Sequence, residues 1–152
     1  MAVEADEAFM QEALSLAREA QGAGEVPIGA VLVMDGAVLG RGFNSPVLRS
    51  DPTAHAEVLA LREAASRTGN YRLGGSTLYV TLEPCPMCAG ALVHARVHRL
   101  VFGSRDLRFG GVRSKFRLTD SELLNHRVEV VEGVCAAEAV ELLQSFFAER
   151  RR

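Results

Sequence analysis

Four side chains with the chemistry to bind and use a metal ion stand in two short segments of the sequence. His55 and Glu57 form a His-x-Glu pair, and Cys85 and Cys88 form a Cys-x-x-Cys pair directly after Pro84. One imidazole and two thiolates give a zinc ion three protein ligands, and catalytic zinc sites leave the fourth position for water. A glutamate nearby can take a proton from that water and pass it to a substrate. The two segments therefore predict a hydrolytic zinc site.

The alternative is a structural zinc ion that only crosslinks the fold. A structural site fills all four coordination positions with protein atoms, so it needs a fourth side chain. The spare candidates show no recognisable ligand spacing with the first three; they are His94, His98, His126 and Cys135. In addition, H-x-E followed downstream by P-C-x-x-C is the pattern of zinc-dependent nucleobase and nucleoside deaminases. The sequence favours the catalytic interpretation.

The cysteine pair is expected in the first turn of a helix. If that helix starts near Pro84 and continues to about Ala95, Cys85 and Cys88 lie on one side of its first turn. Proline suits the beginning of a helix, where its missing N–H costs nothing. The partial positive charge of a helix N-terminus also favours the thiolates that zinc binds.

His55 and Glu57 require a second helix start. In a helix interior they would point in nearly opposite directions, so they can serve one site only if the first turn points end-on at the metal. Asp51 and Pro52 provide a cap and a proline start for a helix over 52–67. We therefore expect two helix N-termini to face one ion.

The rest of the chain predicts an α/β domain around these two helices. The chain is expected to open with a helix over 6–20, strands over 27–34 and 37–44 joined by a hairpin turn, a loop at 45–46 and the helix over 52–67. A strand over 78–81, the cysteine helix, and strands over 100–102 and 128–131 follow. The last element is a helix over 136–150 with Val140, Leu143 and Phe147 on its apolar stripe. This alternation predicts a three-layer α/β/α fold with a mixed central sheet of about five strands, starting with an antiparallel hairpin. Both metal-binding segments lie just beyond strand ends, where such sheets place their sites.

Length and composition fit one domain over residues 1–152. The chain has 48% hydrophobic and 24% charged residues, no apolar run of the ~20 residues that a membrane helix needs, and no basic-then-apolar signal peptide. Its three cysteines, two of them in the C-x-x-C pair, argue against a disulfide framework and for a reducing compartment. We expect a cytoplasmic protein that does not associate with membranes.

Positive charge is concentrated locally, although the net charge is −2. Residues 94–117 carry seven basic side chains against Asp106 alone, and the chain ends in three arginines, Arg150 to Arg152. The seven are Arg96, Arg99, Arg105, Arg108, Arg113, Lys115 and Arg117. The two clusters could form a footprint for a polyanion if the fold brings them together. The alternative is a solvated surface without a partner.

Longer segments around these residues resemble known deaminases. Segments 51–57 (DPTAHAE) and 81–91 (TLEPCPMCAGA) resemble many of them, including those that act on free guanine or cytosine. Segments 25–31 (EVPIGAV), 101–106 (VFGSRD) and 125–130 (NHRVEV), and the ending Phe146-Phe147 with arginines after it, resemble the bacterial tRNA-specific adenosine deaminases. The likeness covers about residues 9–150 and places the chain in the cytidine-deaminase-like superfamily.

The resemblance implies a role for individual residues. His55, Cys85 and Cys88 would bind one Zn²⁺ ion per subunit, and Glu57 would be the catalytic proton shuttle. The residues expected at the substrate are Val26, Pro27, Asn44, Ala56, Asp106, Phe147 and Arg150, of which the last two would hold the anticodon loop.

Several of these residues also have a purely structural interpretation. Asn44 could be a turn residue at a strand end, and residues 26–27 could simply begin a strand. Asp106 could cap a helix or pair with Arg105. Phe147 could belong to the core, because it fits the apolar stripe of the last helix.

The reaction that the resemblance implies is hydrolytic deamination of adenosine to inosine at the wobble position, position 34, of a tRNA, with an arginine tRNA as the expected acceptor. A zinc-bound hydroxide would attack C6 while Glu57 protonates N1, and ammonia would leave. A base in the anticodon loop is partly unstacked already, so extruding it costs less than opening a duplex pair. The family also implies a homodimer whose second subunit adds to the RNA surface.

Two other functions stay open at this point. A deaminase of a free nucleobase or nucleoside (guanine, cytosine or adenosine) would keep every catalytic residue and change only the substrate. A non-catalytic zinc-containing RNA-binding module would keep the ligands without the reaction. In addition, residues 107–115 (LRFGGVRSK) depart from the family pattern, which is smaller and richer in glycine and alanine there, so contacts of this loop with RNA do not carry over.

Overall fold

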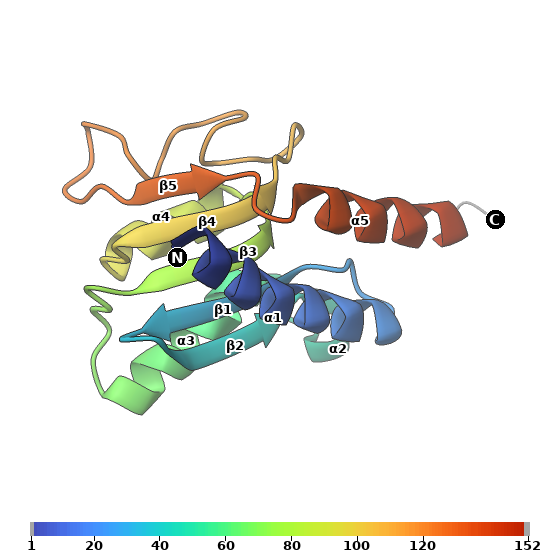
Figure 1. The fold of residues 1–152 in the computed structure, drawn as a ribbon, viewed down its shortest axis with the longest axis horizontal. Coiled ribbons are helices and arrows are strands. Elements are labelled where there is room, and N and C mark those ends of the chain that lie inside the picture. Colours follow the sequence, from blue (N-terminus) through green and yellow to red (C-terminus); the bar gives the residue numbers. More distant parts are fainter. Residues whose placement is uncertain (1, 151–152) are drawn as a thin grey trace.

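A mixed five-stranded sheet runs through the centre of the computed structural model, which describes residues 2–150 (Figure 1). The strand order is β2-β1-β3-β4-β5, and the strands span Gly29–Met34 (β1), Ala37–Phe43 (β2), Thr77–Leu82 (β3), Arg99–Ser104 (β4) and Glu129–Glu132 (β5). β1 pairs antiparallel with both β2 and β3, whereas β4 and β5 extend the sheet in parallel with β3. The predicted sheet, including its opening hairpin, is confirmed.

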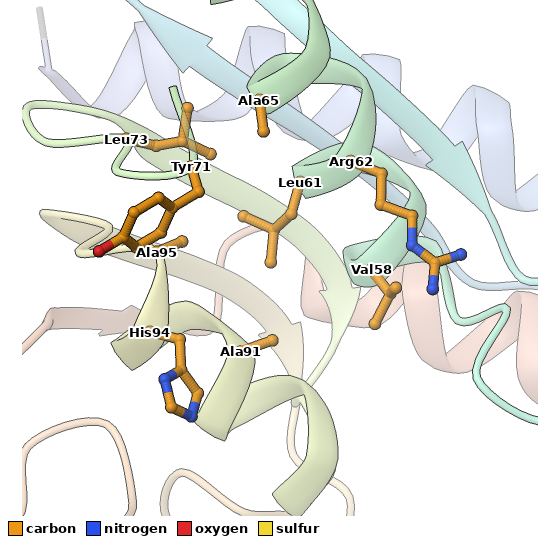
Figure 2. A pocket seen from close by; sticks show the side chains of 9 residues that line it. All are labelled: Val58, Leu61, Arg62, Ala65, Tyr71, Leu73, Ala91, His94 and Ala95. Carbon is orange, nitrogen blue, oxygen red and sulfur yellow. The ribbon is translucent and has the colours of Figure 1, made fainter. Parts of the chain in front are cut away.

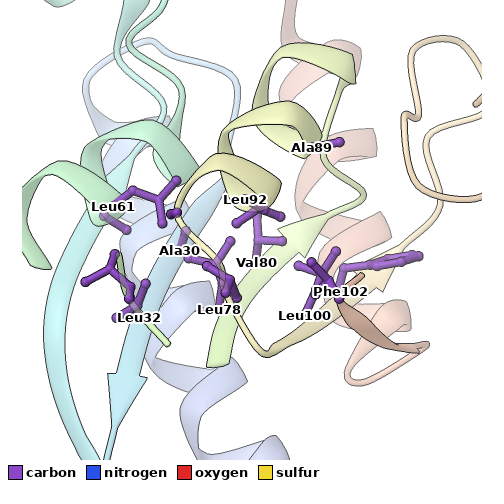
Figure 3. Packing of buried hydrophobic residues seen from close by; sticks show 14 of the residues in the cluster. Ala30, Leu32, Leu61, Leu78, Val80, Ala89, Leu92, Leu100 and Phe102 are labelled. Atoms are coloured by element: carbon purple, nitrogen blue, oxygen red, sulfur yellow. The ribbon is translucent and has the colours of Figure 1, made fainter. Parts of the chain in front are cut away.

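Helices cover both faces of this sheet (Figure 1). α1 (Ala2–Gly22) and α5 (Ala136–Arg150) pack on one face, and α3 (Ala56–Thr68) and α4 (Pro86–His94) pack on the other. The apolar core under α3 and α4, shown in Figure 3, includes Leu32, Leu61, Leu78, Leu92 and Phe102. The core under α1 and α5 includes Met10, Leu14, Val31, Tyr79 and Ala139. These two cores give the three-layer α/β/α architecture that the sequence predicts.

The helix α3 begins later than predicted. Asp51 Oδ1 accepts hydrogen bonds from the backbone N–H of Thr53 at 2.8 Å and from its hydroxyl at 2.7 Å. This closes a separate turn, so the helix starts only at Ala56 and the expected start at Pro52 is wrong. His55 takes the N-cap position with an extended backbone.

The helix α4 also begins two residues later than predicted. Its first residue is Pro86 rather than Pro84, and Cys85 is its N-cap. Neither the Cys85 nor the His55 side chain bonds the first turn of the helix that it precedes. Both side chains can therefore turn toward a ligand in front of the helix N-termini.

A short helix stands where a loop was expected. α2 (Pro46–Arg49) follows β2, and the carboxylate of Glu25 accepts hydrogen bonds from the backbone N–H groups of Val47 at 3.3 Å and Leu48 at 2.6 Å. Glu25 is buried, so its carboxylate satisfies two N–H groups that a helix start leaves unpaired. This contact joins residues 22 and 23 positions apart, which local sequence patterns do not reveal.

Glycines in β2 let α3 lie directly on the sheet. A Cβ atom at Gly42 would lie 2.3 Å from the carbonyl oxygen of Ala56, and one at Gly40 would lie 2.0 Å from that of Ala60. Such gaps admit backbone but no side chain. The close packing fixes the first turn of α3, and with it the direction in which His55 and Glu57 point.

The helix α5 turns a different face to the sheet than predicted. Its buried residues are Ala139 and Phe146, whereas Phe147 is 44% exposed. The guanidinium of Arg150 lies 4.3 Å from the centre of the Phe146 ring and donates a hydrogen bond to the carbonyl of Gly24, beside the end of α1. The expectation that Phe147 lies on the buried stripe is therefore wrong.

Candidate active site

Three metal-binding atoms converge in front of α3 and α4. His55 Nδ1 lies 3.6 Å from Cys85 Sγ and 3.5 Å from Cys88 Sγ, and the three atoms all lie within 4.8 Å of one another. Zinc bonds of about 2.0 Å to nitrogen and about 2.3 Å to sulfur, at tetrahedral angles, place such atoms about 3.5 Å apart. Among residues 2–150 this group has no fourth protein donor. The donor set and its spacing fit a zinc ion that keeps one coordination position open.

The charge state of the cysteines suits a metal ion. The thiol of Cys88 and the ring of His55 lower the pKa of Cys85 to about 4, so Cys85 is a thiolate near neutral pH. Hydrogen bonding to Cys85 in turn raises the pKa of Cys88 and that of His55. A bound zinc ion would deprotonate both sulfurs.

Glu57 lies beside these ligands as the second residue of α3. Its side chain is buried, and this burial raises the pKa of the carboxyl to about 7, with the negative charge of Cys85 acting in the same direction. A carboxyl group that titrates near neutral pH can both accept and return a proton there. Glu57 thus has the position and the acidity of a proton shuttle.

A large cleft opens over the metal-binding group. Its volume is about 1090 Å³, and His55, Glu57 and Cys85 belong to its lining, whereas Cys88 is fully buried. The other lining residues are Val26, Ile28, Asn44, Pro46, Leu82, Glu83, Pro86, Met87, Arg105, Asp106, Leu107, Arg108, Phe109, Leu143, Gln144 and Phe147. The site is therefore accessible to a ligand larger than a single nucleobase.

Four of the seven residues expected at the substrate line this cleft; they are Val26, Asn44, Asp106 and Phe147. Pro27 and Ala56 are buried and do not belong to the lining. Arg150 does not belong to it either, and its guanidinium donates a hydrogen bond to the carbonyl of Gly24. Asp106 does not pair with Arg105: its Oδ1 accepts hydrogen bonds from the backbone N–H groups of Arg108 at 3.0 Å and Phe109 at 3.2 Å.

The predicted basic footprint is largely neutralised. Arg99 binds the buried Asp6 at 2.6 Å, Arg105 binds Glu132 at 2.7 Å, and both Arg113 and Arg117 bind Asp120. Arg108 lines the cleft. Arg151 and Arg152 lie outside the described residues. The charge of this surface therefore favours binding of a polyanion less than the number of arginines indicates.

Glu83 is a residue of the site that sequence reasoning missed. It stands two residues before Cys85, is 2% exposed, and lines the cleft. Burial acts to raise the pKa of Glu83, but hydrogen bonds from Ser114 and from backbone N–H groups outweigh this effect and hold that pKa below its usual value. The available signal was an acidic residue directly after an apolar strand, next to the cysteine segment.

The fold and this ligand set define a deaminase. The model of the MafB19-like deaminases matches residues 4–151 of the chain. A tRNA-specific adenosine deaminase of Haemophilus influenzae is 52% identical over 149 residues, which cover 97% of this chain and 86% of that protein. The one of Bacillus subtilis is 47% identical over 147 residues, which cover 97% of this chain and 91% of the other. The chain belongs to the family of the tRNA-specific adenosine deaminases.

Solved structures of two kinds share the fold. One, from a study of A-to-I editing by tRNA:A34 deaminases at the wobble position, is 45% identical with a TM-score of 0.86 and covers 89% of this chain and 98% of its own. A guanine deaminase from Nitrosomonas europaea is 27% identical with a TM-score of 0.82 and covers 93% of this chain and 84% of its own. The fold alone therefore does not choose between a tRNA and a free base.

Proposed function

We propose that the protein converts adenosine to inosine at the wobble position of a tRNA, and that an arginine tRNA is its acceptor. The carrying observation is the group of His55, Cys85 and Cys88 at the floor of an open cleft, with the buried Glu57 beside it. Relatives up to 52% identical that are named for this activity support the choice of substrate. The cleft is also large enough to admit an extruded nucleotide and its neighbours.

The proposed cofactor is one Zn²⁺ ion per subunit, held by His55, Cys85 and Cys88. When bound, the ion supplies Lewis acidity that makes water nucleophilic near neutral pH. Glu57 would take one proton from that water and deliver it to N1 of the adenine ring. It would then carry the second proton, from the oxygen now bonded to C6, to the departing amine, so that ammonia leaves as the C6 carbonyl forms. Asn44, at the end of β2, lines the cleft where it can orient the nucleoside.

We also propose a homodimer. A shallow hollow of about 320 Å³ lies between α3 and α4, and its lining consists mostly of apolar side chains, as Figure 2 shows: Val58, Leu61, Arg62, Ala65, Tyr71, Leu73, Ala91, His94 and Ala95. Tyr71 is 66% exposed, so a second copy of the chain docked here would remove apolar ring surface from water. A mass in solution twice the 16.4 kDa of one chain would support the dimer, and a mass of 16.4 kDa would exclude it.

A cytoplasmic location completes the proposal. The three cysteines are free, and zinc binding needs two of them reduced, as they are in a reducing compartment. Within the described chain, no helix is both long and apolar enough for a membrane span.

Salt dependence separates this function from deamination of a free base. We expect kcat/KM on an anticodon stem-loop to fall about tenfold between about 50 and about 200 mM salt, because each phosphate contact releases counterions. Turnover of free guanine, cytosine or adenosine serves as the control. A flat salt response with comparable turnover of a free base would favour the substrate class of the Nitrosomonas europaea enzyme instead.

A further inference from the structure

The carboxylate of Glu83 organises a whole loop of the cleft. Its Oε1 accepts a hydrogen bond from the backbone N–H of Asp106 at 3.0 Å, and its Oε2 accepts from those of Val112 at 3.1 Å, Arg113 at 2.7 Å and Ser114 at 3.0 Å. The hydroxyl of Ser114 donates to Oε1 as well. One buried side chain therefore ties down both ends of the segment 106–114.

The loop packs closely against the side chain of Glu83. A Cβ atom at Gly110 would lie 2.3 Å from Glu83 Oε2, and one at Gly111 would lie 2.8 Å from the backbone nitrogen of Pro86. The N–H of Gly111 also donates to the carbonyl of Pro84 at 2.8 Å. Only glycine lets the loop approach the carboxylate and the zinc-ligand segment in this way.

The tip of the loop carries exposed side chains at the mouth of the cleft. Leu107 is 73% exposed and Phe109 is 66% exposed, and both line the cleft together with Arg108. Hydrogen bonds to Asp106 fix the backbone of Arg108 and Phe109. The backbone of Phe109 is thus held in place, whereas its ring is exposed to solvent.

We propose that Glu83 is a positioning residue that presets the loop 106–114, so that Phe109 forms a platform for a nucleobase next to the target adenosine. The inference rests on the proposed function, because a platform beside the cleft serves a polynucleotide and not a free base. Aromatic side chains stack on any base, and each such contact changes affinity by about 5- to 150-fold. A loop that is ordered before binding keeps this gain in affinity. A mobile loop loses part of the gain, because ordering the loop on binding costs conformational entropy.

Glu83→Gln tests the inference. The glutamine side chain has an NH₂ group in place of one carboxylate oxygen, and this group cannot accept hydrogen bonds from the backbone N–H groups of the loop. We expect KM for an anticodon stem-loop to rise about tenfold, with kcat within about threefold of wild type and zinc content unchanged. Hydrogen exchange of the amides of residues 106 and 112–114 should accelerate. Glu122→Gln, on an exposed side chain, is the matched control. A fall in kcat with KM unchanged, or a loss of zinc, would overturn the proposal.

A double-mutant cycle tests whether Glu83 acts through Phe109. If it does, the KM increases of Glu83→Gln and Phe109→Ala do not multiply in the double variant; independent, multiplying effects would overturn the proposal. Should Glu83→Gln fail to fold, Gly110→Ala pushes a methyl group at the same carboxylate and is expected to raise KM similarly, with Gly74→Ala, which has open space, as its control. Unchanged KM in Gly110→Ala would also count against the proposal.

The two proposals can fail separately. If the wild type edits the stem-loop and Glu83→Gln leaves KM unchanged, the role of Glu83 is wrong and the tRNA function stands. If the wild type does not edit the stem-loop, both proposals fail.

Discussion

Glu57→Ala is expected to lose nearly all turnover and to keep its zinc. The carboxyl of Glu57 is buried beside the three ligands without belonging to their group, so its removal leaves the ion held and deletes the proton transfers. Acid–base catalysis by one positioned side chain contributes about 10²- to 10⁴-fold, and Glu57 serves both proton transfers, so a loss of at least about 10³-fold is expected. The rate of inosine formation and the zinc content per chain measure the two parts.

Glu63→Ala on the same helix is the matched control. Glu63 is exposed, and its carboxylate accepts a hydrogen bond from the backbone of Arg41, so its loss should change the rate little. Turnover of Glu57→Ala within about tenfold of wild type would show that Glu57 does not move protons in the reaction. Loss of zinc from this variant would mean that Glu57 is a ligand.

Cys88→Ala is expected to lose both zinc and turnover. Cys88 Sγ is one of only three protein donors in the described group, and two donors hold zinc far more weakly than three. After dialysis, the zinc content should drop from one ion per chain to near zero, and activity should drop with it. Metal analysis and the deaminase assay on the same sample measure both.

Cys135→Ala provides the control for this variant. Cys135 is also a free thiol, but it contacts Gln11 at 3.6 Å and does not belong to the metal-binding group. It should keep zinc and activity. If Cys88→Ala retains a full complement of zinc, or stays active without it, the ligand assignment fails.

The convergence of His55, Cys85 and Cys88, with Glu57 beside them, could be predicted from the sequence because their geometry is local. His55 and Glu57 stand at one helix start, and Cys85 and Cys88 stand at another, so short spacings determine where the side chains point. Even there, α3 starts four residues later than predicted, because Asp51 closes its own turn, and α4 starts two residues later. The alternation of helices and strands was likewise enough to predict the three layers and the hairpin.

The rest of the site depends on contacts between distant segments. Glu83 binds backbone groups 23 to 31 residues away. The loop 106–114 has no periodic pattern, so the sequence does not indicate that it folds back onto Glu83. The spacing of apolar residues in α5 likewise placed Phe147 on the buried stripe, whereas Phe146 is buried there and packs against Arg150, which binds Gly24. Counting arginines also failed to anticipate that Asp120 pairs with two of them.

Direct sequencing of an edited RNA is the closest test of the central claim. The zinc-loaded protein is incubated with an arginine tRNA anticodon stem-loop that has adenosine at the wobble position, and inosine is read as guanosine. We predict an A-to-G change at that position alone, and none with Glu57→Ala. An unchanged wobble adenosine, from a sample that deaminates free guanine, cytosine or adenosine, would contradict the proposed function.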